Sequence, residues 1–347
     1  MRKLCSAEQP EPRRNTWEGK NLAFLILVVA ITVVVFLGLF LLRNRMKNTW
    51  KNRAHVVMAY PAFLILLLMA YIPMTGLILA FKTYDFTAGS FYTMPWADPI
   101  FKNFRVLSAS KQLFYTMTKN TLMYYVLFTV IGTFLNIVLA IAIDQFVFKR
   151  VAKTMQTIMI IPIFVSYAAV TFIVYAFISP DTGIINQVMG THIEYYKSSG
   201  VDYWPTILTI VKMWNSVGYG SVLYMSVLAG IDTGLYEAAQ IDGAGKWKQI
   251  WHITLPSLIP MITVMLLLSV GGIMKSDTGL FYQVTRDIGG LYPKTQVIDS
   301  YILGQIRSKP NWGFTSAATF FQSIVGLLMM LGANGLVRKI APENALF

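Results

Sequence analysis

Residues 232–256 read DTGLYEAAQIDGAGKWKQIWHITLP, a polar stretch that lies between two long hydrophobic runs. Asp232 can cap the first turn of a helix, and Glu237, Ala238 and Ala239 are good helix formers. Gly243 then supplies a hinge, because only glycine turns there without steric cost. The first half of the stretch therefore predicts a short helix that ends at a sharp turn.

The second half of the stretch predicts another short helix, followed by the next apolar span. The residues that share one face of this helix, at three-and-four spacing, are Trp247, Ile250, Trp251 and Thr254. We expect Pro256 and Pro260 to bracket the beginning of the span. Two short helices set at an angle would form a compact element that a neighbouring protein can bind.

The composition is that of a membrane protein with several spans. Of the 347 residues, 55% are hydrophobic and 13% are charged. Uncharged runs of membrane-spanning length recur, so we expect an all-α polytopic membrane protein. The net charge is +13, and many basic residues form short clusters beside the apolar runs, which fits anionic lipid better than nucleic acid. Cys5 is alone and the three histidines are scattered, so neither a disulfide framework nor a metal site is expected.

Apolar runs divide the chain into segments. A polar tail at residues 1–20 precedes an extra N-terminal span at 21–42, which is too long for a signal-peptide core. A basic loop at 43–55 leads into a six-span core at 56–340, and a short tail follows at 341–347. The expected core spans are residues 56–81, 120–146, 154–178, 205–231, 258–274 and 316–337.

Three long loops separate these spans. The first, residues 82–119, is rich in aromatic side chains, which suit interfacial packing or a sugar-stacking surface, and we favour interfacial packing. The second, residues 179–204, is somewhat acidic and begins with a turn. The third, residues 275–315, shows little helical periodicity.

The polar stretch resembles the EAA loop of ABC importer permeases, in which a coupling helix docks into a groove of the cytoplasmic ATPase. Every fixed position of the pattern is filled. These positions are Glu237-Ala238-Ala239, Gly243 after three residues, Ile253 after nine more, and Leu255-Pro256 after one more. The wider resemblance covers roughly residues 50–347 and is to maltose-type permeases that carry oligosaccharides or polysaccharide fragments.

The resemblance implies a fold, a function and partners. The fold is the transmembrane domain of a type I ABC importer, with six core spans plus one extra N-terminal span. The chain would import an oligosaccharide or polysaccharide fragment with a second homologous permease, two copies of an ABC ATPase and an extracellular solute-binding protein. It would bind no cofactor itself, because ATP and Mg belong to the ATPase. The residues that the resemblance assigns to ATPase coupling are Glu237, Ala238, Ala239, Asp242, Gly243, Ile253, Leu255 and Pro256.

The orientation follows from the motif more firmly than from the charges. In a bacterial plasma membrane, the coupling loop and the C-terminus would be cytoplasmic. Basic residues are then similar in number in the inner and outer loops, although the inner clusters are shorter and denser. The extra span would leave the N-terminus outside, yet the tail before it is as basic as the loop after it. The charges therefore cannot place the N-terminus.

Polar side chains inside apolar spans are costly, so they are candidates for a translocation path. With the aromatic residue beside one of them, these candidates are Asn136, Trp214, Asn215, Ser216, Gln322 and Asn334. Amides and hydroxyls can bond sugar hydroxyls, and an indole can stack on a sugar ring. The same polar groups commonly bridge neighbouring helices, so both roles stay open. Lys212 and Lys275 lie near span ends, and we expect them to extend toward the interface.

No catalytic constellation accompanies these residues. The sequence has no Walker-type phosphate loop, HExxH motif or paired-carboxylate arrangement, so ATP hydrolysis is expected on a separate subunit. Two other functions stay open. A permease for a different solute, such as phosphate or a polyamine, would need a charged lining of its path. A membrane-embedded glycosyl-transfer enzyme would need an acidic or metal-binding cluster at a membrane face.

Overall fold

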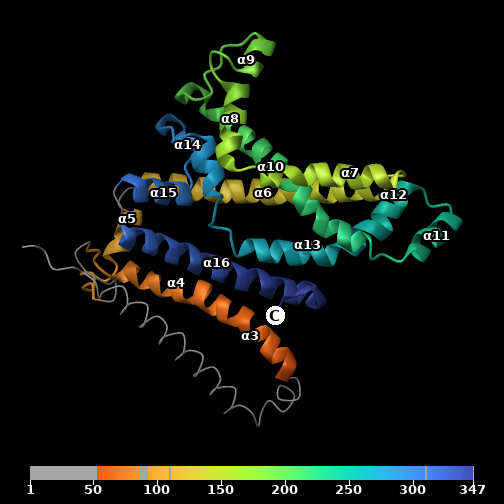
Figure 1. The fold of residues 1–347 in the computed structure, drawn as a ribbon, viewed down its shortest axis with the longest axis horizontal. Coiled ribbons are helices and arrows are strands. Elements are labelled where there is room, and N and C mark those ends of the chain that lie inside the picture. The colour runs from red at the N-terminus through yellow and green to blue at the C-terminus, as the bar shows by residue number, and fades with distance from the viewer. Residues whose placement is uncertain (1–52, 86–92, 109–110, 309–310, 347) are drawn as a thin grey trace, which may run out of the picture. The chain divides into compact units, whose positions relative to one another are not determined.

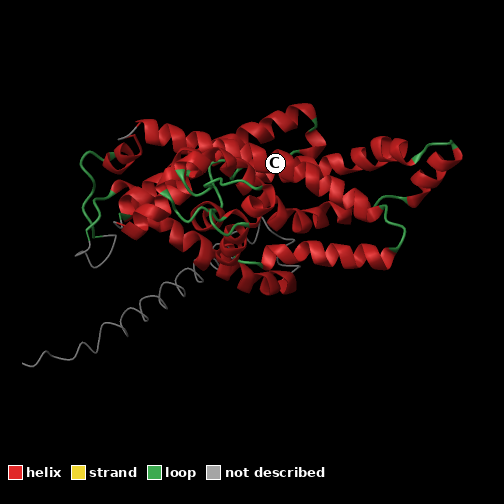
Figure 2. Cartoon of the chain, turned by 90° about the horizontal axis from the view of Figure 1, so that it is seen from above, coloured by secondary structure: helices red, strands yellow, loops and turns green. Residues whose placement is uncertain are grey.

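The structure is a computed structural model that describes residues 53–85, 93–108, 111–308 and 311–346 (Figure 1). The expected polar tail, the extra span at 21–42 and most of the basic loop lie outside these ranges. The chain divides into two compact units, residues 1–76 and 77–347. Over the described ranges the regular structure is helical (Figure 2), apart from an isolated antiparallel bridge between Lys82 and Trp96.

The described part of the first unit is an apolar helical run with changes of pitch. It comprises α3 (Arg53–Leu66), the π-helical η2 (Leu67–Tyr71), α4 (Ile72–Met74) and the start of the 3₁₀-helical η3 (Thr75–Phe81). Pro61 lies inside α3, and Pro73 lies in α4. Proline has no N–H to donate, so changes of helical pitch are expected near it.

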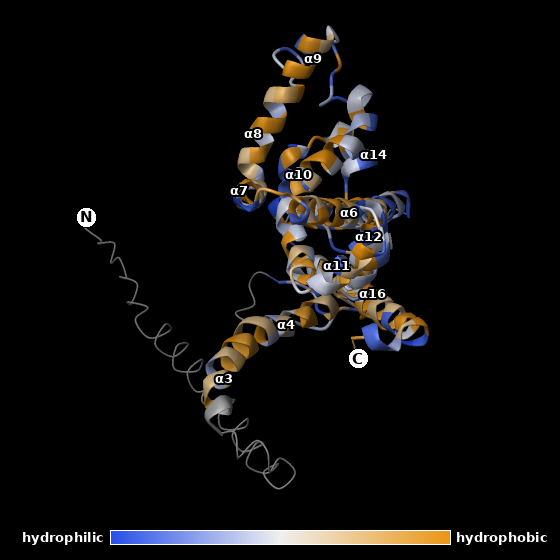
Figure 3. Cartoon of the chain, turned by 90° about the vertical axis from the view of Figure 1, so that its right-hand side faces the viewer, coloured by the Kyte–Doolittle hydropathy of each residue, from blue (hydrophilic) through white to orange (hydrophobic). Residues whose placement is uncertain are grey.

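The second unit is built from helices with short connections, and hydrophobic residues predominate along them (Figure 3). In chain order they are α5 (Lys102–Ser108), α6 (Lys111–Asp144), α7 (Lys149–Ile160), η4 (Ile161–Phe164), α8 (Tyr167–Ile178), α9 (Ile184–Met189), η5 (Ser198–Tyr203), α10 (Trp204–Leu228), α11 (Thr233–Ile241), α12 (Lys246–Gln249), η6 (Ile250–Thr254), α13 (Leu255–Val270), η7 (Gly279–Val284), η8 (Gly289–Leu291), α14 (Tyr292–Thr295), α15 (Ile298–Ser308), α16 (Trp312–Ile340) and η9 (Pro342–Asn344).

Helices α6 and α10 form the most extensive helix pair of this unit. Small residues let α10 approach its neighbours closely, as in other membrane helices. A Cβ added to Gly220 would lie 2.5 Å from the Asn136 amide of α6, and one added to Gly218 would lie 1.7 Å from the Met159 carbonyl oxygen of α7. The backbone of α10 is therefore in direct contact with α7.

The expected span at 154–178 is not a single straight helix. Residues 149–164 and 167–178 form two helical arms that meet at an angle of 99°, and Figure 1 shows α8 rising steeply from α7. Pro162 lies in η4 at the end of the first arm, and Ser166 caps α8 by accepting from the Ala169 N–H at 3.4 Å. A proline followed by a new N-cap both ends one helix and starts another.

Four described segments are long and apolar enough to cross a membrane, namely residues 57–81, 111–144, 246–270 and 312–340. The bent pair would make a fifth. Helix α10, at the expected fourth span, is 25 residues long but carries Lys212, Asn215 and several hydroxyl groups. The count of six core spans therefore stays a prediction.

Short helices fill the third loop, although its sequence has little helical periodicity. They are η7, η8, α14 and α15, within residues 275–315. Leu280, Val284 and Leu291 are completely buried there, in a hydrophobic core that includes Tyr124 of α6 and Trp204 of α10. These helices are held by packing against other elements rather than by an amphipathic pattern of their own, which explains why periodicity does not reveal them.

We expect Gly218→Ala to lower the stability of the assembled protein by about 1–3 kcal/mol, the usual cost of overpacking. The added methyl group would meet the Met159 carbonyl oxygen. Gly332→Ala on α16 is the matched control, because nothing lies within 4 Å of its added methyl group. Thermal unfolding of the purified protein measures both variants, and equal midpoints would contradict the close contact of α10 and α7.

Candidate functional site

Helix α11 begins and ends as its sequence predicts. The Asp232 carboxylate accepts from the Gly234 N–H at 2.9 Å and caps the first turn. At the other end, the Gly243 N–H donates to Gln240 and the Ala244 N–H donates to Ala239. Gly243 has φ = 75°, in the left-handed region that glycine adopts without strain. The turn that the sequence predicts at Gly243 is therefore present.

The helix after this turn is not separate from the next span. Residues 246–270 form one continuous helical segment, comprising α12, η6 and α13. Pro256 lies in the first turn of α13, as expected for the beginning of the span, but the π-helical turn of η6 joins it directly to the helix before it. A π-turn changes the hydrogen-bond register, which is one way in which a helix accommodates a local strain.

Side-chain contacts hold the two halves of the stretch 232–256, here called the coupling loop, against each other. The Tyr236 hydroxyl lies 3.0 Å from the Thr254 hydroxyl. The Gln249 amide is buried and donates to the Ala244 carbonyl at 2.9 Å. Lys246 donates to Gln145, which follows the end of α6, at 3.3 Å. The loop is thus a defined body attached to the end of α6.

The outer surface of the coupling loop carries large exposed apolar side chains. Trp247 is 76% exposed, Trp251 is 64% exposed and Ile241 is 88% exposed. The exposed residues among those assigned to coupling are Glu237, Ala238, Asp242, Gly243 and Pro256, whereas Ala239, Ile253 and Leu255 are half-buried. Exposed apolar groups beside polar ones are typical of a surface that binds a protein.

At the bend between η4 and α8, one amide of α10 contacts both arms. Asn215 Nδ2 donates to the Pro162 carbonyl at 2.8 Å, and Asn215 Oδ1 accepts from the Tyr167 hydroxyl at 3.3 Å. Pro162 precedes the bend, and Tyr167 begins α8. Asn215 is buried, so its side chain bridges helices, which is one of the two roles that its sequence position leaves open.

An ion pair continues this chain of contacts. Lys212 Nζ lies 2.9 Å from Asp277 Oδ2 and 3.5 Å from the Tyr167 hydroxyl oxygen. The Lys212 side chain is 25% exposed and that of Asp277 is 30% exposed. The charge of Lys212 is therefore compensated within the protein, and its position relative to the membrane interface stays a prediction. Polar contacts run without interruption from Asp277 through Lys212, Tyr167 and Asn215 to Pro162.

The segment after α13 that carries Asp277 is held from several helices. Gln322 of α16 donates to the Met274 carbonyl at 2.6 Å and to Asp299 Oδ1 at 3.2 Å. Asp299 Oδ2 accepts from both the backbone N–H and the hydroxyl of Ser276, at 2.6 and 2.8 Å. With the ion pair to α10, residues 274–277 are held by α10, α15 and α16. These four residues are here called the clamp.

A polar cavity of about 300 Å³ lies between α6, α10 and the clamped segment, at the lower end of the size range of small-molecule sites. Its lining combines four aromatic rings, three hydroxyl groups and three charged groups. These are Tyr124, Tyr125, Phe128 and Phe281, then Thr121, Thr129 and Ser276, then Lys212, Lys275 and Asp277. Lys275 is exposed and makes no ion pair with any described residue.

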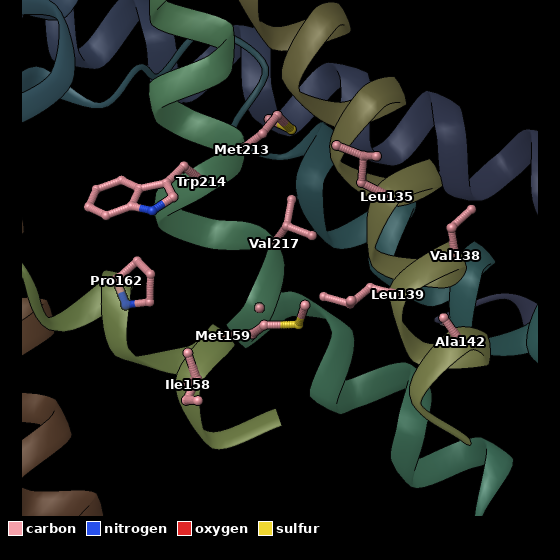
Figure 4. A pocket seen from close by; sticks show the side chains of 11 residues that line it. Leu135, Val138, Leu139, Ala142, Ile158, Met159, Pro162, Met213, Trp214 and Val217 are labelled. Atoms are coloured by element: carbon pink, nitrogen blue, oxygen red, sulfur yellow. The ribbon is translucent and has the colours of Figure 1, made fainter. Parts of the chain in front are cut away.

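Trp214 lies between two apolar cavities instead. The larger one has a volume of about 560 Å³, and Figure 4 shows Trp214 and Pro162 across it from Leu135 and Leu139 of α6. The second cavity, of about 430 Å³, lies between α8 and α10. Neither lining contains a charged side chain. The expected pairing of Trp214 with a polar path is therefore absent from these cavities.

The other candidate path residues make local contacts. Ser216 donates to a carbonyl of its own helix at 2.8 Å. Asn136 packs against α10, and its Oδ1 is buried with no hydrogen-bond partner in the described structure. Asn334 Oδ1 accepts from the N–H of Leu346 in the C-terminal tail at 2.8 Å. None of the six candidates, Gln322 included, lines the polar cavity.

Sequence reasoning missed Tyr124, Tyr125, Tyr167 and Asp277. The one available signal was Lys212, because a lysine inside an apolar span requires a partner or a water-filled cavity. Its partner is 65 residues away in the chain, and no local pattern identifies it.

A turn in the third loop adopts an unusual backbone. Arg286 and Asp287 have φ values of 57° and 52°, which residues with a side chain rarely adopt. The Arg286 guanidinium lies 4.7 Å from the centre of the Tyr175 ring, and the Tyr292 hydroxyl donates to Asp287 Oδ1 at 2.9 Å. Burial, followed by the interaction with Asp287, raises the pKa of Tyr292 to about 12. The hydroxyl therefore stays protonated at neutral pH and continues to hold the turn.

Comparison with known proteins identifies relatives over most of the chain. Residues 132–342 match the family described as binding-protein-dependent transport system inner membrane component. The chain is 30% identical over 290 residues to Protein LplB of Bacillus subtilis (strain 168), covering 82% of this chain and 88% of that protein. It is 26% identical over 296 residues to the polygalacturonan/rhamnogalacturonan transport system permease protein YteP of the same organism, covering 83% and 88%.

A solved structure resembles the fold. It is that of a bacterial alginate ABC transporter in complex with an alginate pentasaccharide-bound periplasmic protein. The TM-score is 0.71 at 30% sequence identity, and the match covers 86% of this chain and 98% of that chain. The matched family region contains the coupling loop and both members of the Lys212–Asp277 pair.

We expect Asn215→Leu to destabilise the protein by about 1–3 kcal/mol, because the Tyr167 hydroxyl would lose its amide acceptor and the Pro162 carbonyl would keep only the Val165 N–H. Ser216→Ala is the control on the same helix, since its hydroxyl bonds only to its own backbone. Thermal unfolding and limited proteolysis measure the two variants. A stable Asn215→Leu protein with impaired transport would instead assign the amide to the path.

Proposed function

The chain belongs to the family of binding-protein-dependent transport system inner membrane components, and from this premise we propose that it imports an oligosaccharide or polysaccharide fragment. As a member of this family it is a multi-pass membrane subunit and not an enzyme, and ATP is hydrolysed by a separate subunit. A solute-binding protein delivers the substrate to importers of this family.

The observation that carries the proposed substrate class is the similarity to carbohydrate importers over more than four fifths of the chain. One relative is named for polygalacturonan and rhamnogalacturonan, and the similar solved transporter is named for alginate. The polar cavity supports the same class, because the half-buried rings of Tyr125 and Phe128 can pack on the apolar faces of sugars and the Thr129 hydroxyl can bond sugar hydroxyls.

The alternatives differ in what they require. A path for phosphate would need several uncompensated cations, and one for a polyamine would need uncompensated carboxylates. In the polar cavity, Lys212 and Asp277 neutralise each other, which leaves one lysine, Lys275, without an ion pair to a described residue rather than several. Family membership favours transport over a membrane-embedded glycosyl-transfer enzyme.

In the proposed complex this chain pairs with a second, homologous permease and two copies of an ABC ATPase, which bind ATP and Mg. The coupling loop and the C-terminus would face the cytoplasm of a bacterium, and lipid would cover the apolar faces. The exposed groups of the coupling loop, including Glu237, Trp247 and Trp251, would contact a groove of the ATPase. Closure of the ATPase would then move the loop and tilt the helices between inward-open and outward-open states.

We expect Gly243→Leu to uncouple transport from ATP hydrolysis, because a side chain in the left-handed region costs roughly 1–2 kcal/mol and would change the angle of the turn. Gly245→Leu is the matched control. No atom lies within 4 Å of an added Cβ at either glycine, and Gly245 has φ = −67°. Substrate-stimulated ATPase activity and uptake in proteoliposomes measure the coupling. Equal uptake by both variants would contradict a role for the turn.

Glu237→Ala is expected to reduce uptake several-fold while insertion into the membrane stays normal, because Glu237 is exposed and forms no ion pair with a described residue. Co-purification of the ATPase measures the proposed contact directly. Full uptake with undiminished ATPase binding would show that the carboxylate has no part in coupling.

The substrate class is tested with the purified complex and its binding protein in proteoliposomes. ATP-dependent accumulation of galacturonate or alginate oligomers is the expected result. Accumulation of phosphate or a polyamine, with no response to any glycan offered, would refute the proposed function.

A further inference from the structure

We propose that Lys275 and Lys212 make the polar cavity selective for carboxylates, so that the preferred substrates are oligosaccharides carrying uronate groups. The inference rests on the proposed function and adds the chemical feature of the sugar that this chain recognises. It assigns Lys275 and Lys212 as specificity-determining residues and Asp277 as a carboxylate that occupies the site when no substrate is bound.

Lys275 has a backbone that its neighbours hold in place and an exposed side chain that forms no ion pair with a described residue. It lies in the clamp, between Met274, whose carbonyl accepts from Gln322, and Ser276, whose N–H and hydroxyl donate to Asp299. The backbone on both sides of Lys275 is therefore held by α15 and α16. Holding the backbone of a charged residue in place lowers the entropic cost of binding an anion.

Asp299, whose carboxylate bonds Ser276 beside Lys275, forms no ion pair with Lys275. Both oxygens of Asp299 are engaged, Oδ2 with Ser276 and Oδ1 with Gln322. No ion pair links Asp299 to a described basic residue. The positive charge of Lys275 is therefore available to a ligand in the cavity that it lines.

Lys212 offers a second cation whose present partner can be exchanged. The pair with Asp277 is 2.9 Å long, and both side chains are partly exposed in the cavity. A uronate carboxylate has the same charge and geometry as the Asp277 carboxylate and can take its place on Lys212 Nζ. Asp277 then still accepts from the Leu280 N–H, at 3.4 Å, and remains at the start of η7.

The remaining lining suits the rest of a uronate ring. Tyr124 and Phe281 pack with their ring centres 4.7 Å apart, and Phe128 lies 5.5 Å from Tyr124. Tyr124 and Phe281 are buried and form the floor of the cavity, whereas the half-buried Phe128 and Tyr125 supply apolar surface and Thr129 supplies a hydroxyl group. The two apolar cavities beside Trp214 have no charged side chain in their linings and so could not bind a carboxylate in this way.

The experiment compares tetragalacturonate with its methyl ester, which keeps the sugar but removes the negative charges. Each is loaded onto the binding protein to saturation, as verified by titration, and the concentration of the loaded binding protein is then varied, so that kcat and KM refer to the loaded protein. In proteoliposomes, Lys275→Gln is expected to lower kcat/KM for tetragalacturonate about tenfold, the size of effect expected for one charged hydrogen bond, and to leave the methyl ester unaffected. Lys275→Arg is expected to restore transport of the acid.

Lys294→Gln is the control, because it removes the same charge from the third loop at a residue that does not line the cavity and whose ion pair with Asp202 is exposed. Asp277→Asn is the second variant, and it keeps an oxygen that can accept from the Leu280 N–H. Because it frees Lys212, it is expected to lower KM for tetragalacturonate and not for the ester.

The outcomes separate this inference from the function on which it rests. Equal loss of acid and ester transport in Lys275→Gln, or no loss of either, would overturn carboxylate selection. Wild-type import of a neutral oligosaccharide in preference to the acid would do the same while leaving sugar import intact. Failure of the wild-type complex to import any oligosaccharide would refute the proposed function itself.

Discussion

The hydrogen bond from Asn215 to the Pro162 carbonyl is the contact on which the arrangement of the central helices depends. A 99° bend releases backbone groups from the helical ladder, and a bilayer interior offers no water to satisfy them. The Pro162 carbonyl accepts from the Val165 N–H at 3.1 Å and from the Asn215 amide at 2.8 Å, and Asn215 also accepts from Tyr167, which in turn contacts Lys212. Hydrogen bonds therefore connect the bend to the ion pair that lines the polar cavity.

The coupling loop could be predicted from sequence because its determinants are local. Asp232 caps a helix two residues away, and Gly243 has the left-handed backbone that its position requires. A motif with fixed spacing carries the same information, so sequence and structure agree on α11 and its turn. The continuous helix beyond Gly245 was missed, because proline commonly marks a helix start and the π-turn before Pro256 has no sequence signature.

The polar cavity could not be predicted, because long-range contacts build it. Lys212 and Asp277 are far apart in the chain, and so are Gln322 and Met274. Three of the amides predicted to line the path instead form hydrogen bonds to backbone groups of the protein. Asn215 bonds at the bend, Gln322 bonds to the clamp and Asn334 bonds to the C-terminal tail. Inside an apolar medium, polar side chains that satisfy backbone groups and those that face a ligand look identical in sequence.

Helix α6 gives the protein a mechanical property of its own. Its 34 residues form one uninterrupted helix, about 51 Å long at 1.5 Å per residue, whereas the hydrocarbon layer is about 30 Å thick. Asn120, in the third turn, donates to Gln296 at 3.0 Å, while Gln145, just past the other end, accepts from Lys246 of the coupling loop. Because α6 also supplies Thr121, Tyr124 and Tyr125 to the polar cavity, a single stiff helix links the coupling loop to the cavity wall, and a displacement of the loop would be transmitted along it.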